Sequence, residues 1–375
     1  MINNSTFLVT IIVGLLSLNI VLLLNDINKE KLKDIYYMYT NSFIIIHENG
    51  GNSSYYKTTI RNIPCIGKND NNFRNKIIPR TREVKITHYL SNSEGEDQTK
   101  FIPREYNIFN DNLTLVKNGE ELINGNIYYI IYKDEHPIWS PMYEGYLREN
   151  VYQNYSLRTI SLKPRIFLIE NFLDDEEIKN IIKIGQKKTW DKSQIYTSNG
   201  NINSSSRNSN QTWIRKEDDN FIIKIDNRIK GIVRIEDDDL QEPLQLLKYN
   251  EKGYYYAHHD TFNQNIYSND TNIQRGQQRL LTFFIYLNDV EEGGETVFLY
   301  GGERGYILND ENINYKDCTK GFKVKPKKGS AILWYNLFPN DNIKNPIIDP
   351  YHLHAGCPPI KGKKLAINKW IKNKV

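Results

Sequence analysis

Residues 249–260, YNEKGYYYAHHD, end in the triplet His258-His259-Asp260. The aromatic run before the triplet favours a β-strand, and the Gly before it marks a turn. Alternate residues of a strand point to the same face, so His258 and Asp260 would present an imidazole and a carboxylate side by side. The stretch therefore predicts one edge of a metal site on a β-structure.

A second imidazole must come from elsewhere in the chain to complete such a site. His354 supplies it, within the segment YHLHAGCPP at 351–359. Two imidazoles and one carboxylate on one side of a metal leave open positions opposite, which is typical of non-haem iron(II) oxygenases. Oxygen and a chelating co-substrate fill such positions. On sequence grounds His259 and His352 compete for the ligand roles.

Lys364 opens a β-like run at 364–371, KLAINKWI. Its face-mates Ala366 and Asn368 are small or medium-sized, which would leave room for a cation inside a barrel. A solvated lysine is the alternative, because several other lysines lie nearby in the sequence. Of these, Lys361, Lys363 and Lys369 are expected to be solvated.

From Lys163 onward the sequence has the pattern of a folded domain. Residues 164–169 read as a strand, and Asp174 with Glu177 forms a capping-box pattern that predicts a helix. Short β-rich runs then alternate with Gly, Pro, Asn and Asp, which favours a mainly β jelly roll, or double-stranded β-helix, with flanking helices over residues 160–375. The runs lie at 244–249, 253–259, 279–287, 295–300, 322–325, 330–336 and 364–371.

The N-terminal part contains one long apolar run. After a short tail at 1–6, residues 7–24 form about 18 residues without a charge, enough for a transmembrane helix. A cleaved signal peptide is the alternative, but no small-residue cleavage site follows. Lysines after the span favour a cytosolic C-terminal side. Residues 25–155 carry no chemical motif and are expected to form a stalk or accessory region.

Composition narrows the range of partners. Lys plus Arg number 49 against 45 Asp plus Glu, and these charges are scattered along the 375 residues. Nucleic acid is therefore not an expected partner. Three cysteines, Cys65, Cys318 and Cys357, are too few for a disulfide framework and lack metal-finger spacing.

The region 164–371 resembles the catalytic domain of prolyl 4-hydroxylases, above all the plant, algal and collagen-type branch. Several separate motifs stand in the family's order, which makes the resemblance specific. They are PR at 164–165 with NFL at 171–173, YNEKGYYYAHHD at 249–260, GQQRLLT at 276–282, YLNDVEEGGETVF at 286–298, VKPKKGSA at 324–331 and the segment 354–370.

The resemblance implies a role for each matching site residue. It assigns the iron(II) ligands to His258, Asp260 and His354, and it pairs Lys364 with the distal carboxylate of 2-oxoglutarate. Tyr249 and Thr296 would also contact the co-substrate, while Tyr255 and Arg279 would face the substrate. His259 is the unconstrained middle residue of the triplet. Oxygen is the other co-substrate, and L-ascorbate is implied as the reductant that rescues oxidised iron.

The same resemblance gives the expected function and location. The expected reaction is 4-hydroxylation of peptidyl-proline in collagen-like or Pro-rich proteins. One alternative is that the same iron site acts on lysine side chains, although Lys364 argues against this. The other is a non-catalytic, membrane-tethered peptide-binding module. Cys318 and Cys357 lie in matched segments, so a disulfide and a lumenal domain of a single-pass endoplasmic reticulum protein are expected, in a host membrane if the chain is viral.

The sequence also departs from the family in places. Lys252-Gly253 replaces the usual Gly-Gln order, so the turn before the His-x-Asp strand is expected to differ in shape. Lys372 stands where some members have a substrate-side histidine. The loop at 301–323 keeps little of the family's sequence, and such a loop is where peptide preference would be set.

Overall fold

The structure is a computed structural model that describes residues 43–48, 59–62, 106–117, 127–132, 135–197, 200–202, 204–263, 265–267, 269–308, 310–338 and 346–374. The chain divides into two compact units, and the larger contains residues 129–375. The predicted anchor at 7–24 lies outside the described residues. Within the described part, no helix has both the length and the apolar character needed to cross a bilayer.

Four strands precede the main β-structure: β1 (Phe43–Glu48), β2 (Thr59–Asn62), β3 (Tyr106–Asn110) and β4 (Ile127–Tyr132). β1 and β2 pair antiparallel, with Phe43 opposite Asn62.

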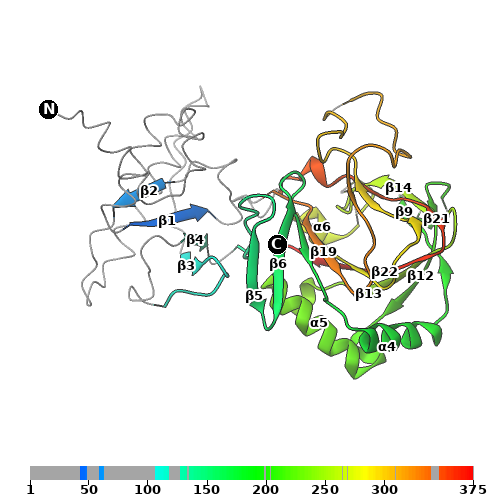
Figure 1. The fold of residues 1–375 in the computed structure, drawn as a ribbon, viewed down its shortest axis with the longest axis horizontal. Helices are drawn as coiled ribbons and strands as arrows, with labels where there is room; N and C mark the ends of the chain where they lie inside the picture. The colour runs from blue at the N-terminus through cyan, green and yellow to red at the C-terminus, as the bar shows by residue number, and fades with distance from the viewer. Residues whose placement is uncertain are drawn as a thin grey trace, which may run out of the picture. The chain divides into compact units, whose positions relative to one another are not determined.

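Two sheets form the larger unit (Figure 1). The first has nine strands in the order β5 (Leu147–Tyr152), β6 (Tyr155–Ser161), β7 (Ile166–Ile169), β19 (Ala331–Tyr335), β15 (Arg279–Tyr286), β22 (Lys364–Lys372), β13 (Leu244–Tyr249), β12 (Asn210–Ile214) and β8 (Asp191–Lys192). The second has five, in the order β11 (Arg207–Asn208), β14 (Tyr254–His258), β20 (His354–Gly356), β17 (Thr296–Phe298) and β18 (Phe322–Val324). Two short ribbons join β9 (Ile195–Thr197) to β10 (Gly200–Ile202) and β16 (Glu292–Gly293) to β21 (Pro359–Lys361).

Between β13 and β22 the chain passes back and forth between the two sheets, with β17 and β18 forming an antiparallel pair within the smaller one, which is the arrangement of a double-stranded β-helix. The four central neighbours β13-β22-β15-β19 belong to one sheet, and β14-β20-β17-β18 belong to the other. Side chains from both sheets share one core, with Phe284 and Trp334 from the larger sheet packed near Phe298 from the smaller one. The mainly β fold predicted for this region is confirmed.

β15 is a nearly unbroken apolar strand in the interior of the larger sheet. Its sequence RLLTFFIY is buried at every position except the first. A central strand covered on both faces has no polar side to alternate with, so it reads as a continuous hydrophobic run. Thr282 is the one uncharged polar residue within it, and its side chain is fully buried.

Helices cover the outside of the larger sheet. α4 (Asp175–Gln186) begins at the predicted capping box, where Asp174 accepts from the Glu177 amide and Glu177 accepts from the Asp174 amide. α5 (Asn220–Val233), which the sequence reading missed, lies beside α4 (Figure 1), and Arg228 on α5 forms a bidentate pair with Glu177 on α4. The shorter helices are α6 (Thr271–Gln274) and the 3-10 turns η3 (Lys216–Asp218), η4 (Asp238–Leu240) and η5 (Pro350–His352).

The β-structure begins before the predicted boundary at residue 160. β5 and β6 extend the nine-stranded sheet through pairing of β6 with β7. Trp139 is fully buried, and its indole nitrogen donates to the Ile232 carbonyl oxygen in α5. Part of the expected stalk therefore belongs to the domain. The sequence does not reveal these contacts, because the polar loops between the strands show no periodicity.

The turn before β14 contains a non-glycine residue in the left-handed region. Lys252 adopts a left-handed backbone with φ 64°. A Cβ on Gly253 would lie 2.8 Å from the Asn208 carbonyl oxygen, so only glycine fits there without a backbone shift. The turn thereby sets β14 close against β11.

Cys318 and Cys357 form the expected disulfide, with their Cα atoms 5.9 Å apart. Cys357 follows β20, and Cys318 belongs to the variable loop after β17. The bridge ties that loop to the strand that carries His354.

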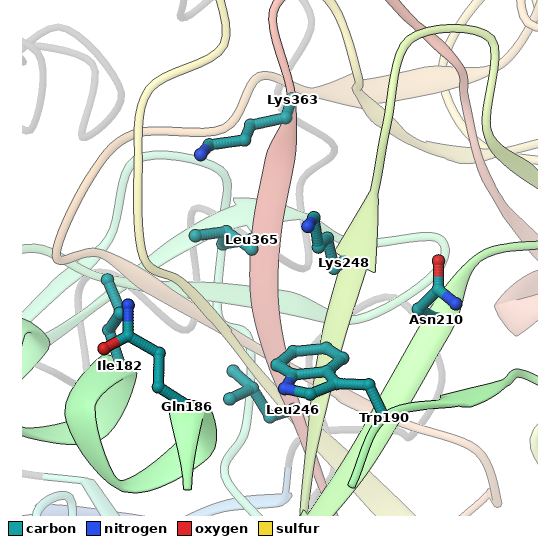
Figure 2. Close-up of a pocket in the computed structure, with 8 residues that line it drawn as sticks. All are labelled: Ile182, Gln186, Trp190, Asn210, Leu246, Lys248, Lys363 and Leu365. Atoms are coloured by element: carbon teal, nitrogen blue, oxygen red, sulfur yellow. The ribbon is translucent and has the colours of Figure 1, made fainter. Parts of the chain in front are cut away.

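A groove of about 330 Å3 lies on the outer face of the larger sheet (Figure 2). Leu246 and Leu365 line it, whereas the alternate residues Leu247 and Ala366 point into the core between the sheets. The groove is therefore separated by the sheet from the interior, and none of the predicted site residues lines it.

Lys369 is buried, whereas the sequence suggested a solvated lysine. It is 1% exposed on the outer face of β22, and its ammonium donates to Asp226 of α5, which is 2% exposed. Lys216 lies 3.1 Å from the second oxygen of that carboxylate. Burial lowers the pKa of Lys369, while Asp226 opposes that shift. The pair fixes α5 to the sheet.

We expect Asp226→Ala to lower the free energy of unfolding by about 3 to 5 kcal/mol, because it leaves Lys369 as an uncompensated buried charge. Denaturant unfolding measures this loss. The double variant Asp226→Leu with Lys369→Met should recover most of it, since neither member of the pair is then charged. The matched control is Asp175→Ala, whose exposed pair with Lys328 should matter little. An unfolding midpoint unchanged in Asp226→Ala would contradict this account.

Candidate active site

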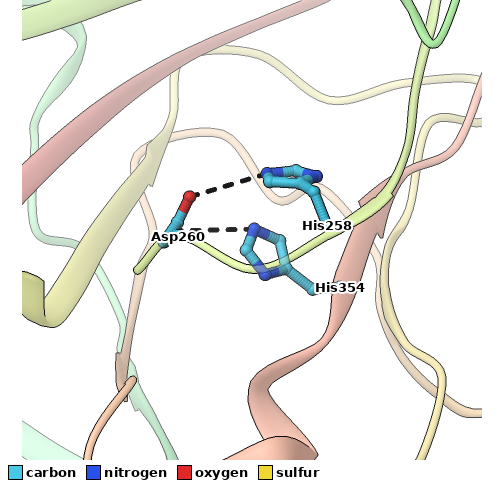
Figure 3. A group of neighbouring side chains, drawn as sticks. All are labelled: His258, Asp260 and His354. Carbon is cyan, nitrogen blue, oxygen red and sulfur yellow. Dashed lines mark ion pairs between the residues drawn. The ribbon is translucent and has the colours of Figure 1, made fainter. Parts of the chain in front are cut away.

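The structure brings the predicted triad together at the edge between the two strands β14 and β20. His258 ends β14, His354 begins β20, and these two residues face each other in the ladder. Asp260 lies just beyond β14. Ligand atoms of His258, Asp260 and His354 all lie within 4.8 Å of one another (Figure 3).

Both imidazoles turn their Nε2 atoms toward the carboxylate. His258 Nε2 lies 3.5 Å from Asp260 Oδ1, and His354 Nε2 lies 3.7 Å from Oδ2. Their Nδ1 atoms lie 2.9 Å from the Tyr256 carbonyl oxygen and 2.8 Å from the His352 carbonyl oxygen. A carbonyl oxygen only accepts, so each Nδ1 carries the hydrogen and each Nε2 keeps a lone pair for a metal.

Asp260 is held as an ionised carboxylate. It is 4% exposed, and Thr282 Oγ1 donates to its Oδ2 at 2.7 Å. Burial alone would raise the pKa of Asp260, but the neighbouring His354, His258 and Arg279 together hold it well below its usual value. The side chain is therefore a ready anionic ligand at neutral pH.

The donor set fits iron(II). Burial lowers the pKa of His354 to about 4, which leaves its imidazole neutral at pH 7, the form that binds a metal. Two imidazoles with one carboxylate form the two-His, one-carboxylate set of non-haem iron(II) sites. Within the part of the chain that the structure describes, this is the one group of three such side chains close enough to share an ion.

His259 and His352, the rival ligand candidates, are not part of this group. His259 Nδ1 lies 3.2 Å from His352 Nε2, so the two rings bond to each other instead. Desolvation of its ring lowers the pKa of His259 to about 4 although the residue as a whole is exposed to solvent, and burial lowers the pKa of His352 to about 3, so both are neutral at pH 7. The structure therefore brings His258 and His354, and not His259 and His352, together with Asp260.

Lys364 lies in the core between the sheets and is 1% exposed. Its ammonium lies 5.2 to 5.7 Å from the ring centres of Phe284, Tyr286 and Tyr249, and it donates to Thr296 Oγ1 at 3.3 Å. No carboxylate of the described residues forms an ion pair with it. Burial lowers the pKa of Lys364 to about 7, while the Glu295 charge opposes that shift. Such a cation needs an anionic partner.

Tyr249 and Thr296 lie beside this ammonium, as the family pattern implies. Tyr249 is the direct neighbour of Lys364 across the β13–β22 ladder and is 3% exposed. Thr296 accepts a hydrogen bond of 2.9 Å from the Tyr286 hydroxyl. Tyr286, which the sequence reading missed, thus completes a cluster of hydroxyl groups around one buried charge.

Tyr255 lies against the triad. Its ring stacks on His258 with a centroid distance of 3.6 Å, and the Arg207 guanidinium lies 4.4 Å from the ring centre. Burial raises the pKa of Tyr255 to about 12, so its hydroxyl stays protonated. Arg207, 6% exposed, escaped sequence reading because it stands in a Ser- and Asn-rich stretch typical of a loop.

Arg279 also lies beside the triad, but its charge is already paired. Its guanidinium forms two hydrogen bonds of 2.7 Å with Glu242 and lies 3.7 Å from the Trp370 ring centre. Its Nη1 reaches the Asp260 carbonyl oxygen at 3.5 Å. Glu242 and Trp370 are further residues that sequence reading missed, because their only link to Arg279 is spatial.

Known proteins match this chain over the region that holds the site. The 2OG-Fe(II) oxygenase superfamily matches residues 244–372. Prolyl 4-hydroxylase 2 of Arabidopsis thaliana is 35% identical over 218 residues, which is 57% of this chain and 69% of the relative. Probable prolyl 4-hydroxylase 8 of the same plant is 34% identical over 220 residues, 57% of this chain and 70% of the relative.

Solved structures include a viral collagen prolyl hydroxylase from Paramecium Bursaria Chlorella virus-1 in a 2OG complex. It is 27% identical, with 56% of this chain and 96% of that chain covered and a TM-score of 0.39. The extent of the match to the plant enzymes confirms the family resemblance and the prediction of a dioxygenase. This chain belongs to the prolyl 4-hydroxylase family of 2OG-Fe(II) oxygenases.

Proposed function

We propose that this enzyme hydroxylates peptidyl-proline at C4 in collagen-like or other Pro-rich polypeptides, with iron(II), 2-oxoglutarate and oxygen. The observation that carries the proposal is the pairing of a complete iron-binding triad with a buried, unpaired Lys364 in one β-helix. Iron(II) with 2-oxoglutarate supplies the oxidising chemistry that puts a hydroxyl on an unactivated carbon and releases succinate and carbon dioxide. L-ascorbate would keep the iron reduced.

In this proposal the triad residues hold iron(II) through His258 Nε2, His354 Nε2 and the Asp260 carboxylate. Thr282 orients that carboxylate through its 2.7 Å hydrogen bond, and Asn336 orients Thr282 in turn through a bond of 3.1 Å. Metal ligands whose other polar atoms are held in this way keep their geometry during turnover.

Lys364 would bind the distal carboxylate of 2-oxoglutarate. The anion supplies the partner that the buried ammonium lacks, and binding would raise the lysine pKa again. The Thr296 hydroxyl lies 3.3 Å from the ammonium and the Tyr249 ring centre 5.7 Å from it, so these two residues are the proposed hydrogen-bond partners of the co-substrate. The surrounding aromatic rings exclude water from the ion pair.

Tyr255 and Arg279 are the proposed substrate-side residues. Tyr255 presents a protonated hydroxyl next to the triad. Arg279 presents no unpaired charge, because Glu242 neutralises it; its contribution is to hold Trp370 and the Asp260 backbone in place.

The test is a peptide panel incubated with the purified full-length chain, iron(II) and 2-oxoglutarate. The full chain is used because a fragment starting at residue 160 would lose β5, β6 and Trp139. Mass spectrometry should find oxygen added to proline in a collagen-like or Pro-rich peptide. Oxygen on lysine would favour the alternative side chain, and binding without succinate release would favour a non-catalytic peptide-binding module.

The membrane anchor at 7–24 and a lumenal catalytic domain in the endoplasmic reticulum remain part of the proposal. The Cys318–Cys357 bridge supports an oxidising compartment, whereas the lysines after the span favour the cytosol. Protease protection of the C-terminal domain in sealed microsomes distinguishes the two orientations: digestion without detergent would overturn the lumenal one.

A further inference from the structure

Two histidines beside the metal ligands in the sequence contact each other rather than the triad. His259 is solvent-exposed and follows His258, whereas His352 is fully buried and lies just before His354. Their rings meet edge to face with centroids 4.5 Å apart, and the Nδ1–Nε2 distance is 3.2 Å across a sequence separation of 93. The contact joins the two segments that carry the ligands.

The direction of the hydrogen bonds follows from the acceptors. His352 Nδ1 bonds to the Asp349 carbonyl oxygen, which only accepts, so this nitrogen carries the hydrogen. In a neutral ring the other nitrogen, His352 Nε2, must then be an acceptor. His259 Nδ1 therefore donates to it, and a single ordered chain runs from His259 through His352 to the backbone of η5.

The backbone alone does not hold the Asp260 segment. β14 and β20 pair at Tyr255 with Gly356 and at His258 with His354, with a shift in register between the two pairs. The ladder ends there, so Asp260 lies beyond it. His352 meanwhile holds His354, because its carbonyl oxygen accepts from His354 Nδ1 at 2.8 Å.

We propose that His259 and His352 form a positioning pair that fixes the Asp260 segment against the His354 segment and so sets the affinity of the triad for its metal. The inference rests on the proposed iron site. Groups that orient metal ligands through hydrogen bonds typically contribute 10- to 100-fold in metal affinity. The pair acts through the ligands and does not itself touch metal or substrate.

A second metal ion between the two rings is the competing interpretation, since 3.2 Å also suits two nitrogens that share an ion. Among the described residues no further His, Cys, Asp or Glu completes a second group of three with this pair. The donor on His352 Nδ1 and the acceptor on its Nε2 are accounted for by hydrogen bonds. The geometry thus favours a bond between the rings.

The experiment measures cobalt(II) binding to the purified full-length chain in the absence of oxygen, by the visible absorption of the bound ion. His259→Leu and His352→Leu should each weaken cobalt(II) binding by about 10-fold or more. The double variant should be no weaker than either single one, because the two residues act as a unit. His259→Asn, which keeps an N–H donor near the Nδ1 position, should bind almost as well as the unchanged chain.

Controls separate this inference from the proposed function. His136→Leu removes a histidine that accepts from the Lys374 amide away from the triad, and it should leave cobalt(II) binding unchanged. His259→Leu at the exposed position keeps the test valid if His352→Leu fails to fold. Unchanged affinity in His259→Leu, or a second cobalt(II) equivalent lost in both variants, would overturn the positioning pair. Unchanged affinity in His258→Ala would instead overturn the iron site.

Discussion

Alanine at His258, Asp260 or His354 is expected to abolish 2-oxoglutarate-dependent hydroxylation while the domain stays folded. Each variant removes one of three protein ligands, and the remaining two leave too weak an iron site to support turnover. Asp260→Ala should have the largest effect on metal binding, because it also removes the only anionic ligand. Product formation by mass spectrometry and metal content of the purified variants measure the two losses.

The rival histidines provide the sharpest comparison for this prediction. His352→Ala should retain measurable turnover, since its role is to orient rather than to bind, and His136→Ala should behave as the unchanged protein. Substantial activity in His354→Ala together with its loss in His352→Ala would mean that the ligand assignment is wrong. Circular dichroism of each variant separates lost chemistry from lost fold.

Lys364→Ala is expected to weaken apparent 2-oxoglutarate affinity by on the order of 3 kcal/mol, or about 100-fold, with less effect on iron or peptide binding. Lys364 is 1% exposed and has no ion-pair partner among the described residues, so the co-substrate carboxylate would lose the buried cation proposed to bind it. The free-energy cost of burying an unpaired carboxylate in that core exceeds the net stabilisation that its ion pair with Lys364 provides.

Lys364→Arg should also fail substantially. The aromatic rings of Phe284, Tyr286 and Tyr249 surround the ammonium at under 6 Å, and the larger planar guanidinium does not fit that space. The exposed Lys361 and Lys363 are the matched controls, and alanine there should change little. Lys369 is unsuitable as a control because it is buried against Asp226. An unchanged 2-oxoglutarate affinity in Lys364→Ala would mean that another cation binds the co-substrate.

The pH dependence of co-substrate affinity offers a further check on Lys364. Its pKa is about 7 in the free protein, and only the protonated form pairs with a carboxylate. Apparent affinity should therefore be constant below pH 7 and should fall above it, by at most about tenfold per pH unit. Lys364→Ala should remove this dependence along with most of the affinity.

The sequence predicted the β-helix well because its strands carry their own signals. β13 has the bounds expected for it, β15 and β22 differ from theirs by one residue, and the capping box of α4 forms as predicted. β5 and β6 could not be assigned to the same sheet, since strand partners far apart in the chain leave no local pattern. The same reason hid the link between Trp139 and α5.

The types of residue in the site could be predicted from the sequence, but not which of several residues of the same type takes each role. The His-x-Asp pattern with a distant histidine indicated a metal site, but four histidines were candidates for its two imidazole ligands. In the structure, His259 bonds to His352 and leaves the other two beside Asp260. Lys364 and Lys369 look alike in one strand, and only the face each occupies distinguishes them. The partner of Lys369 lies 143 residues away in a helix, which no spacing rule reveals.

The most direct test of the account measures succinate and hydroxyproline in the same reaction of the full-length chain with a Pro-rich peptide. The account predicts equal amounts of both products, with neither formed after iron is chelated or in Asp260→Ala. Succinate without hydroxyproline, on every collagen-like and Pro-rich peptide offered, would contradict the assignment of peptidyl-proline as the substrate of this site.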